Sequence, residues 1–196
     1  MMRVRADWVV PLPAGLTLFE SMAIGTAGYT SALAIHLLEH NGMDPANGKV
    51  VVNGATGGCA SLAISMLANL GYKVSAVTGK AAEHDYLKSI GAAEVLGREA
   101  LPAGTRPLDK AQWAAGFDSV GGDQLSAMIR RMQQHGAIAS FGNAGGIELH
   151  TTVLPFILRG VRLIGVDSAA TPMKLRQDRK STRLNSSHVK RSRMPS

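Results

Sequence analysis

The feature that most constrains this chain is the run KVVVNGATGGCAS at residues 49–61. Three consecutive valines follow Lys49, and an apolar run without polar alternation is typical of a strand that is covered on both faces. Gly54, Gly57 and Gly58 follow at once. Apolar residues then recur every three or four positions over residues 60–70, which predicts a helix. A strand, a glycine-rich turn and a helix in this order direct backbone N–H groups and a helix N-terminus toward a phosphate.

The glycine turn also has a purely structural interpretation. Glycine-rich turns connect strands and helices where no nucleotide binds, because tight turns need residues that tolerate positive φ. Ala60 stands at the third position of the G-x-G-x-x-G pattern, a substitution that the pattern permits. No Lys-Ser or Lys-Thr pair follows, so the turn lacks the sequence of a P-loop NTPase. The turn favours a dinucleotide phosphate site, with an ordinary strand-to-helix turn as the alternative.

A second expected strand, residues 73–78, ends about twenty residues beyond the glycine turn, where a Rossmann unit meets the adenosine ribose. An acidic residue there binds the 2′-hydroxyl of NAD, whereas a basic residue accommodates the 2′-phosphate of NADP. This chain has Thr78, Gly79 and Lys80 and no acid. A hydroxyl and an ammonium group can bind a phosphate that a carboxylate would repel. The pattern favours NADP, and the alternative is that Lys80 is a solvated surface lysine.

The net charge of +7 belongs almost wholly to the end of the chain. Residues 176–196 hold seven of the 21 Lys/Arg residues and one of the 14 acidic residues, so the preceding body is nearly neutral. This end is poor in apolar residues and has no period, which predicts disorder. The run STRLNSSHVK at 181–190 resembles translated vector sequence, so we expect residues 176–196 to be non-native. A basic tail that binds nucleic acid is the alternative, but we expect no specific nucleic-acid partner.

Cysteine and histidine usage gives no metal motif. Cys59 is the single cysteine and therefore forms no intramolecular disulfide. His36 and His40 form an i,i+4 pair on an expected helix, but no third ligand lies nearby, so a solvated helix face is favoured over a zinc site. The sequence has neither a signal peptide nor a run of about twenty apolar residues. We expect no metal, no membrane partner and a cytoplasmic location.

Strands and helices alternate through most of the chain. The first expected helix begins at Thr17 or Ser21 and runs to His40. Further helices are expected over residues 59–70, 81–90, 123–134 and 152–159. The expected strands are 49–53, 73–78, 94–96, one within 117–122, 137–141 and 161–166. This alternation predicts an α/β fold, a doubly wound parallel Rossmann sheet of six strands in the order 3-2-1-4-5-6. In the first helix, Thr26, Tyr29 and Thr30 either pack closely or face a ligand.

Ligands of such sheets bind beyond the carboxyl ends of the strands. In this chain those ends are glycine-rich or small and polar, at residues 54–59, 78–80, 119–122 and 141–145. Each segment alone is compatible with a plain turn. Because all four would meet at one edge of a parallel sheet, together they predict a rim that admits a dinucleotide.

Six segments together resemble the zinc-independent quinone-oxidoreductase and acryloyl-CoA reductase branch of the medium-chain dehydrogenase/reductase superfamily. They are AIGTAGYTSAL (23–33), VVVNGATGGCASLAI (50–64), AVTGKAAEHDYLKSIGAAEVL (76–96), FDSVGG (117–122), SFGNAGG (140–146) and TTVLPFILRGVRLIGVDS (151–168). The resemblance implies NADPH as the hydride donor. It also implies a small-molecule acceptor, namely an acrylyl-CoA-like thioester, an enone or a quinone.

The resemblance implies cofactor-binding roles for particular residues of this chain, and it identifies no catalytic residue. Cys59 and Ala60 stand where the family usually has valine and glycine. Gly57, Gly58 and Cys59 would approach the pyrophosphate, Thr78, Gly79 and Lys80 the 2′-phosphate, and Thr30 the nicotinamide-side phosphate, while Ser119, Val120, Phe141 and Asn143 would line the cofactor cleft.

Members of this family begin with a GroES-like barrel domain that supplies much of the substrate pocket, and we expect this chain to lack it. Residues 1–18 would be the connector from that domain, and residues 19–170 the NADP-binding Rossmann domain. Hydride transfer needs donor and acceptor in contact in a dry cleft, so little activity is expected from the chain alone. A free-standing nucleotide-binding domain without catalysis is the alternative. We also expect Trp8, Val9 and Phe156 to lack cover, and residues 163–166 to be available for a homodimer through the edge strand.

Overall fold

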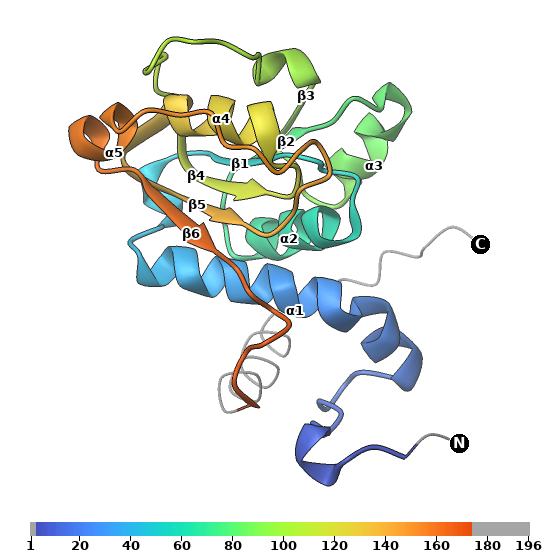
Figure 1. The fold of residues 1–196 in the computed structure, drawn as a ribbon. Helices are drawn as coiled ribbons and strands as arrows, with labels where there is room; N and C mark the ends of the chain where they lie inside the picture. The colour runs from blue at the N-terminus through green and yellow to red at the C-terminus, as the bar shows by residue number, and fades with distance from the viewer. Residues whose placement is uncertain (1–2, 174–196) are drawn as a thin grey trace.

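A computed structural model gives the fold, and it describes residues 3–173 (Figure 1). The expectations for residues 176–196 therefore lie outside the described part of the chain. One six-stranded sheet has the order β3-β2-β1-β4-β5-β6, and every neighbouring pair of strands is parallel. The predicted doubly wound Rossmann sheet is confirmed. Its strands are β1 (Val50–Val52), β2 (Val74–Val77), β3 (Glu94–Leu96), β4 (Trp113–Asp118), β5 (Met132–Ser140) and β6 (Arg162–Gly165).

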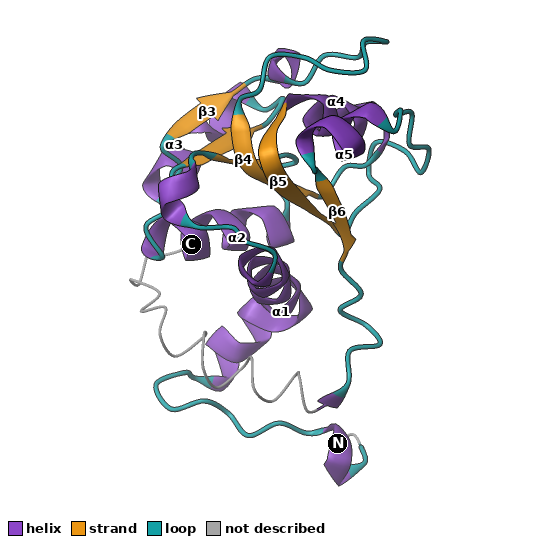
Figure 2. Ribbon diagram, turned by 90° about the vertical axis from the view of Figure 1, so that its left-hand side faces the viewer, coloured by secondary structure: helices purple, strands orange, loops and turns teal. Residues whose placement is uncertain are grey.

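Helices cover both faces of the sheet (Figure 2). The core divides into two clusters, because neighbouring residues of a strand point to opposite faces. Val50 and Val52 lie in the cluster beneath α1, α2 and α3, whereas Val51 lies in the cluster beneath α4. These helices are α1 (Leu18–His40), α2 (Gly58–Asn69), α3 (His84–Ser89), α4 (Gly122–Arg131) and α5 (Leu154–Arg159), with single 3₁₀ turns at Ala6–Trp8, Pro45–Asn47, Ala81–Glu83 and Arg98–Ala100.

Helix α1 begins at a capping box and bends at a glycine. The side chain of Thr17 accepts a hydrogen bond from the Glu20 backbone at 3.1 Å, and the Glu20 carboxylate accepts one from the Thr17 backbone at 2.8 Å. The bend lies at Gly25, whose φ of +43° is outside the helical region. Beyond it Tyr29 and Thr30 are buried, and Thr30 donates to the Thr26 carbonyl at 2.9 Å. Both residues are closely packed in this structure.

The expected helix over residues 123–134 is too long. Helix α4 ends at Arg131, and Met132 is extended and pairs with Trp113 of β4. His135 then takes a φ of +59°, and regular pairing resumes at Ala137 opposite Ala115. The last turn that the pattern assigned to the helix is therefore the start of a strand, because Met132 pairs with Trp113 of β4 instead of continuing α4.

The segment before α1 lies away from the sheet (Figures 1 and 2). Trp8 and Val9 are exposed, as expected. Phe156 is a correction: it is half-buried and packs against the core cluster beneath α4, because α5 lies on the sheet. Within residues 3–173, none of the helices is both long enough and apolar enough to cross a membrane.

Candidate functional site

The loops that follow β1, β4 and β5 contact one another at the carboxyl edge of the sheet. The backbone of Phe141 donates to the Asp118 carbonyl at 3.0 Å, and that of Gly145 donates to the Val120 carbonyl at 2.7 Å. Gly54 lies against Ser119 and Val120, so that a β-carbon at Gly54 would meet the Val120 side chain at 3.0 Å. Three of the four expected rim segments therefore form a continuous set of loops.

The glycine turn leaves the N-terminus of α2 open. Gly57 is the N-cap residue and offers no side-chain hydrogen bond, and the first turn of α2 contains no acidic residue. The turn is tight, because the Gly57 backbone donates to the Gly54 carbonyl at 2.8 Å. The first N–H groups of a helix have no intrahelical acceptor, and they carry the positive end of the helix dipole. Gly58 and Cys59 belong to this first turn, so the arrangement fits a pyrophosphate.

Cys59 is half-buried within the same turn. Burial raises the pKa of its thiol, and a hydrogen bond from its own backbone opposes that rise only in part. The sulfur therefore stays uncharged at neutral pH and adds no negative charge to the open helix end. The side chain that replaces the family's usual valine is thus electrostatically compatible with an anion.

At the end of β2, Thr78 is buried while Gly79 and Lys80 are exposed. The Thr78 hydroxyl accepts a hydrogen bond from the Lys80 backbone at 3.1 Å, which leaves its proton available to donate. Lys80 makes no ion pair with any residue of the described range 3–173. The chemistry of this donor set, a hydroxyl and a free ammonium group without a carboxylate, fits a phosphate ester.

Sequence analysis missed Arg98, which follows β3 and lies directly on Gly79. A β-carbon placed on Gly79 would be 2.6 Å from the Nε atom of Arg98. The signal was present: Arg98 follows the third strand as closely as Lys80 follows the second.

A buried polar cluster behind the rim was also missed. The carboxylate of Asp118 accepts hydrogen bonds from Asn53 at 2.7 Å, from Ser140 at 2.9 Å and from the Gly121 backbone at 2.9 Å. Asn53 in turn accepts from the Ser119 backbone at 2.8 Å. Asn53 and Asp118 are fully buried. The cluster ties the ends of β1, β4 and β5 together. Its signal was a polar residue at the end of each of three apolar strands.

The remaining expected site residues lie around the same edge or behind it. Ser119 donates to the Asn53 carbonyl at 3.0 Å, and Phe141 is half-buried against the core cluster beneath α1. Asn143 is exposed on the loop after β5. Thr30 is the most enclosed, because it is buried in α1 and its hydroxyl, which donates to the Thr26 carbonyl, lies 2.8 Å from the Ser168 hydroxyl and accepts from it. Its backbone and hydroxyl are committed to packing in this structure.

Two further polar regions lie away from the rim. A cavity of about 570 Å³ opens at the amino ends of β5 and β6, where His40, His135 and Arg162 contribute to its lining. Residues 3–173 contain no group of three or more His, Cys, Asp and Glu side chains that could hold a metal ion. Neither this cavity nor the second region, described next, includes an expected cofactor residue.

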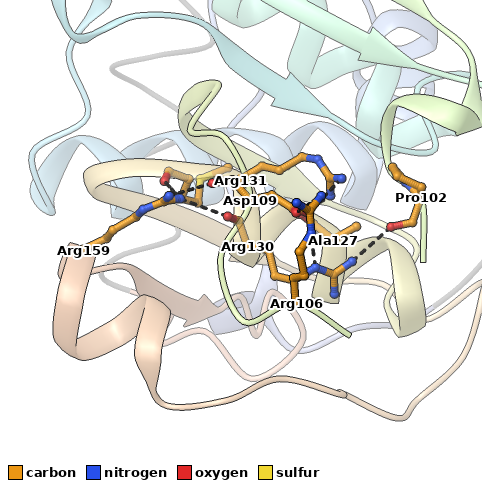
Figure 3. A network of polar contacts seen from close by, with 8 residues as sticks. Pro102, Arg106, Asp109, Ala127, Arg130, Arg131 and Arg159 are labelled. Carbon is orange, nitrogen blue, oxygen red and sulfur yellow. Dashed lines mark hydrogen bonds and ion pairs between the residues drawn. The ribbon is translucent and has the colours of Figure 1, made fainter. Parts of the chain in front are cut away.

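The second region is a buried ion-pair cluster around Asp109 (Figure 3). The Asp109 carboxylate pairs with Arg131 at 2.9 Å, with Arg130 at 3.5 Å and with the exposed Arg106 at 3.0 Å. Arg159 donates to the Asp109 carbonyl at 2.6 Å. Burial lowers the pKa of Arg131, and the Asp109 charge opposes that change. The cluster fastens the segment after Arg98 to the end of α4.

Comparison with known proteins gives concordant matches. The zinc-binding dehydrogenase family model matches residues 58–180. The acrylyl-CoA reductase AcuI of Ruegeria pomeroyi is 47% identical over 170 residues, which is 86% of this chain and 52% of that protein. YhfP of Bacillus subtilis, provisionally named a quinone oxidoreductase, is 50% identical over 174 residues, which is 88% of this chain and 53% of that protein. The chain spans about half the length of the curated relatives it matches.

Two solved structures agree with this match. The yhdH oxidoreductase from Salmonella enterica in complex with NADP has a TM-score of 0.86 and 48% identity, covering 90% of this chain and 54% of its own. The structure of Bacillus subtilis yhfP has NAD bound and gives a TM-score of 0.88 and 49% identity, covering 92% of this chain and 56% of its own. The relatives are thus described with dinucleotides that carry the 2′-phosphate and with one that lacks it.

Proposed function

This chain belongs to the zinc-binding dehydrogenase family, and on that premise we propose that it is the NADPH-binding part of an oxidoreductase. Residues 19–170 would form the cofactor domain, with residues 1–18 as the connector to a substrate domain. The acceptor would be an activated carbon–carbon double bond, as in an acrylyl-CoA-like thioester or an enone, or a quinone. Support comes from relatives named as an acrylyl-CoA reductase and as a quinone oxidoreductase.

The observation that carries this proposal is the open N-terminus of α2 beside a strand end that bears a free cation and no acid. Gly57, Gly58 and Cys59 would approach the pyrophosphate, and the backbone N–H groups of Gly58 and Cys59 would donate to it, because that of Gly57 already donates to the Gly54 carbonyl. Thr78 would donate its hydroxyl proton to the 2′-phosphate, which Gly79 leaves room for and Lys80 neutralises. Thr30, Ser119, Val120, Phe141 and Asn143 would line the remaining length of the cofactor.

When bound, NADPH supplies the hydride. This chain's own residues orient the dinucleotide across the sheet edge and keep water from one side of it. The proposal assigns no catalytic residue and no metal. Because the acceptor would be held from the other side by a further domain, we expect negligible turnover by this chain alone.

The proposal extends to two properties of the whole enzyme. Two copies would pair through β6, because β5 is its single neighbour among the described strands and an edge strand can pair with another chain. The location would be the cytoplasm, because reduction of this kind needs a compartment that supplies the reduced dinucleotide.

The test is a fluorescence titration of NADPH, and then of NADH, into the full chain, repeated with Lys80→Glu. We expect tighter binding of NADPH, and we expect Lys80→Glu to weaken NADPH binding by at least about tenfold while changing NADH binding little. Lys88→Glu is the matched control, because Lys88 is an exposed cation in the last turn of α3, away from the rim. Absence of binding by either dinucleotide would contradict the proposal.

A further inference from the structure

We propose that Arg98 is a second cation for the 2′-phosphate and that it acts with Lys80 to set the preference for NADPH over NADH. The inference deepens the proposed function and rests on it. It assigns a specificity-determining role to a residue outside the glycine turn and outside the strand that carries Thr78.

The pairing of β2 with β3 brings Arg98 to this position. Val77 lies opposite Leu96 in the register, and the Thr78 backbone donates to the Leu96 carbonyl at 3.0 Å. The chain continues for three residues beyond β2 to reach Lys80 and for two residues beyond β3 to reach Arg98. Because the strands are parallel, both cations lie at the same edge of the sheet as the open end of α2.

The Arg98 side chain lies against the bare backbone of Gly79. A β-carbon on Gly79 would be 2.6 Å from the Nε atom of Arg98 and 3.0 Å from its Cζ atom. A side chain at position 79 would therefore displace the guanidinium group. The glycine between Thr78 and Lys80 thus has a role beyond backbone flexibility, which is to let the guanidinium group lie against the turn that carries these two residues.

The charges at this corner of the rim remain uncompensated. Arg98 and Lys80 are exposed, and neither forms an ion pair with a residue in the range 3–173. The nearest acid along the chain, Glu99, folds back against Gly97 rather than over Gly79. Two neighbouring cations without a counter-charge favour a dianionic ligand. A guanidinium group adds a planar fork of donors that matches phosphate, which an ammonium group cannot provide.

The 2′-phosphate is the part of NADPH that NADH lacks. Comparing the affinities for NADPH and NADH therefore distinguishes a contact with the 2′-phosphate from a general effect on dinucleotide binding. We expect Arg98→Ala to weaken NADPH binding by about tenfold, the loss of one charge-assisted hydrogen bond, and to leave NADH binding within about twofold. Arg98→Lys keeps the charge but loses the fork, so its NADPH affinity should lie between those of the wild type and Arg98→Ala. Lys88→Ala, at the position used for the earlier control, serves as the control for a lost surface charge.

The experiment measures dissociation constants for NADPH and NADH with the wild-type chain and these three variants, at one ionic strength. A fall in the NADPH-to-NADH preference in Arg98→Ala, absent in Lys88→Ala, would support the inference. A wild-type chain that prefers NADPH while Arg98→Ala keeps the same preference would overturn the role of Arg98 and leave the proposed function intact. A wild-type chain that binds neither dinucleotide would overturn both.

Discussion

Replacement of Asp118 by alanine is expected to destabilise the chain strongly and to disorganise the cofactor rim. The Asp118 carboxylate is fully buried and accepts hydrogen bonds from four donors, at 2.7–3.2 Å. Two of these donors are the side chains of Asn53 and Ser140, and two are the backbone N–H groups of Val120 and Gly121. Alanine would leave all four without their acceptor at the point where three strands end.

The size of the effect follows from these donors. A buried donor that loses its acceptor costs about 1–3 kcal/mol, and water that enters the space left by the carboxylate recovers part of this. We therefore expect the free energy of unfolding to fall by about 4 kcal/mol. For a chain of this length, that loss corresponds to a fall in Tm of about 10 °C. Because the Val120 and Gly121 backbone groups belong to the rim, NADPH affinity should fall as well.

The assay is thermal and urea denaturation of the wild type, Asp118→Ala, Asp118→Asn and Ser140→Ala. Ser140→Ala removes a single donor and should cost about 1 kcal/mol, whereas Asp118→Asn keeps one acceptor oxygen and should lie between the two. If Asp118→Ala were no less stable than Ser140→Ala, the carboxylate would not be the centre of this cluster, and the argument would be wrong.

Three further predictions follow from the other polar groups. Asp109→Ala should reduce the free energy of unfolding, measured by urea denaturation, by about 3–5 kcal/mol, because it leaves Arg130 and Arg131 buried without a counter-charge. Arg106→Ala should change this free energy by less than about 0.5 kcal/mol, since Arg106 is exposed. The hydrogen bond from Ser75, together with Lys49, lowers the pKa of Glu94. The stability that ionised Glu94 contributes is therefore present above the ordinary carboxyl pKa and is lost as pH falls through the lowered pKa of Glu94. A Tm difference between the wild type and Glu94→Gln that does not shrink in acid would contradict this. The raised pKa of Cys59 predicts alkylation slower than that of a free cysteine at neutral pH, measured by mass spectrometry, with further slowing when NADPH is present.

Sequence reasoning recovered the fold because this chain's strands and turns carry strong local signals. The three valines of β1 and the glycines after them predicted a buried strand and an open helix end, and both are present. Of the two expected starts of the first helix, Thr17 and Ser21, the structure has Thr17 as the cap of α1. The strand order followed from alternation and handedness, and the observed order is the same.

The end of α4 could not be obtained in this way. Residues 132–134 carry no glycine or proline that would stop a helix, and the helix ends because Met132 pairs with Trp113, which lies 19 positions earlier in the sequence. A contact of that kind leaves no local pattern. Phe156 was misjudged for the same reason, because its cover comes from the docking of α5 on the sheet.

The part of the candidate site that a single loop forms could be predicted from the sequence. The parts that two loops form together could not be. The Thr78–Lys80 turn is readable from its own residues. Arg98 reaches the same place only through the pairing of β2 with β3, and Asn53 meets Asp118 only through the pairing of β1 with β4. The site residues themselves remain predictions until a dinucleotide is bound.

The central claim is that a dinucleotide binds along the carboxyl edge of the sheet. The most direct test is amide NMR of the isotope-labelled chain during titration with NADPH. We predict the largest shift changes at residues 57–60, 78–80 and 98, with smaller changes at 119–121 and 141–143. Changes confined to the opposite edge, around His40 and His135, or the absence of any change at saturating NADPH, would contradict the claim.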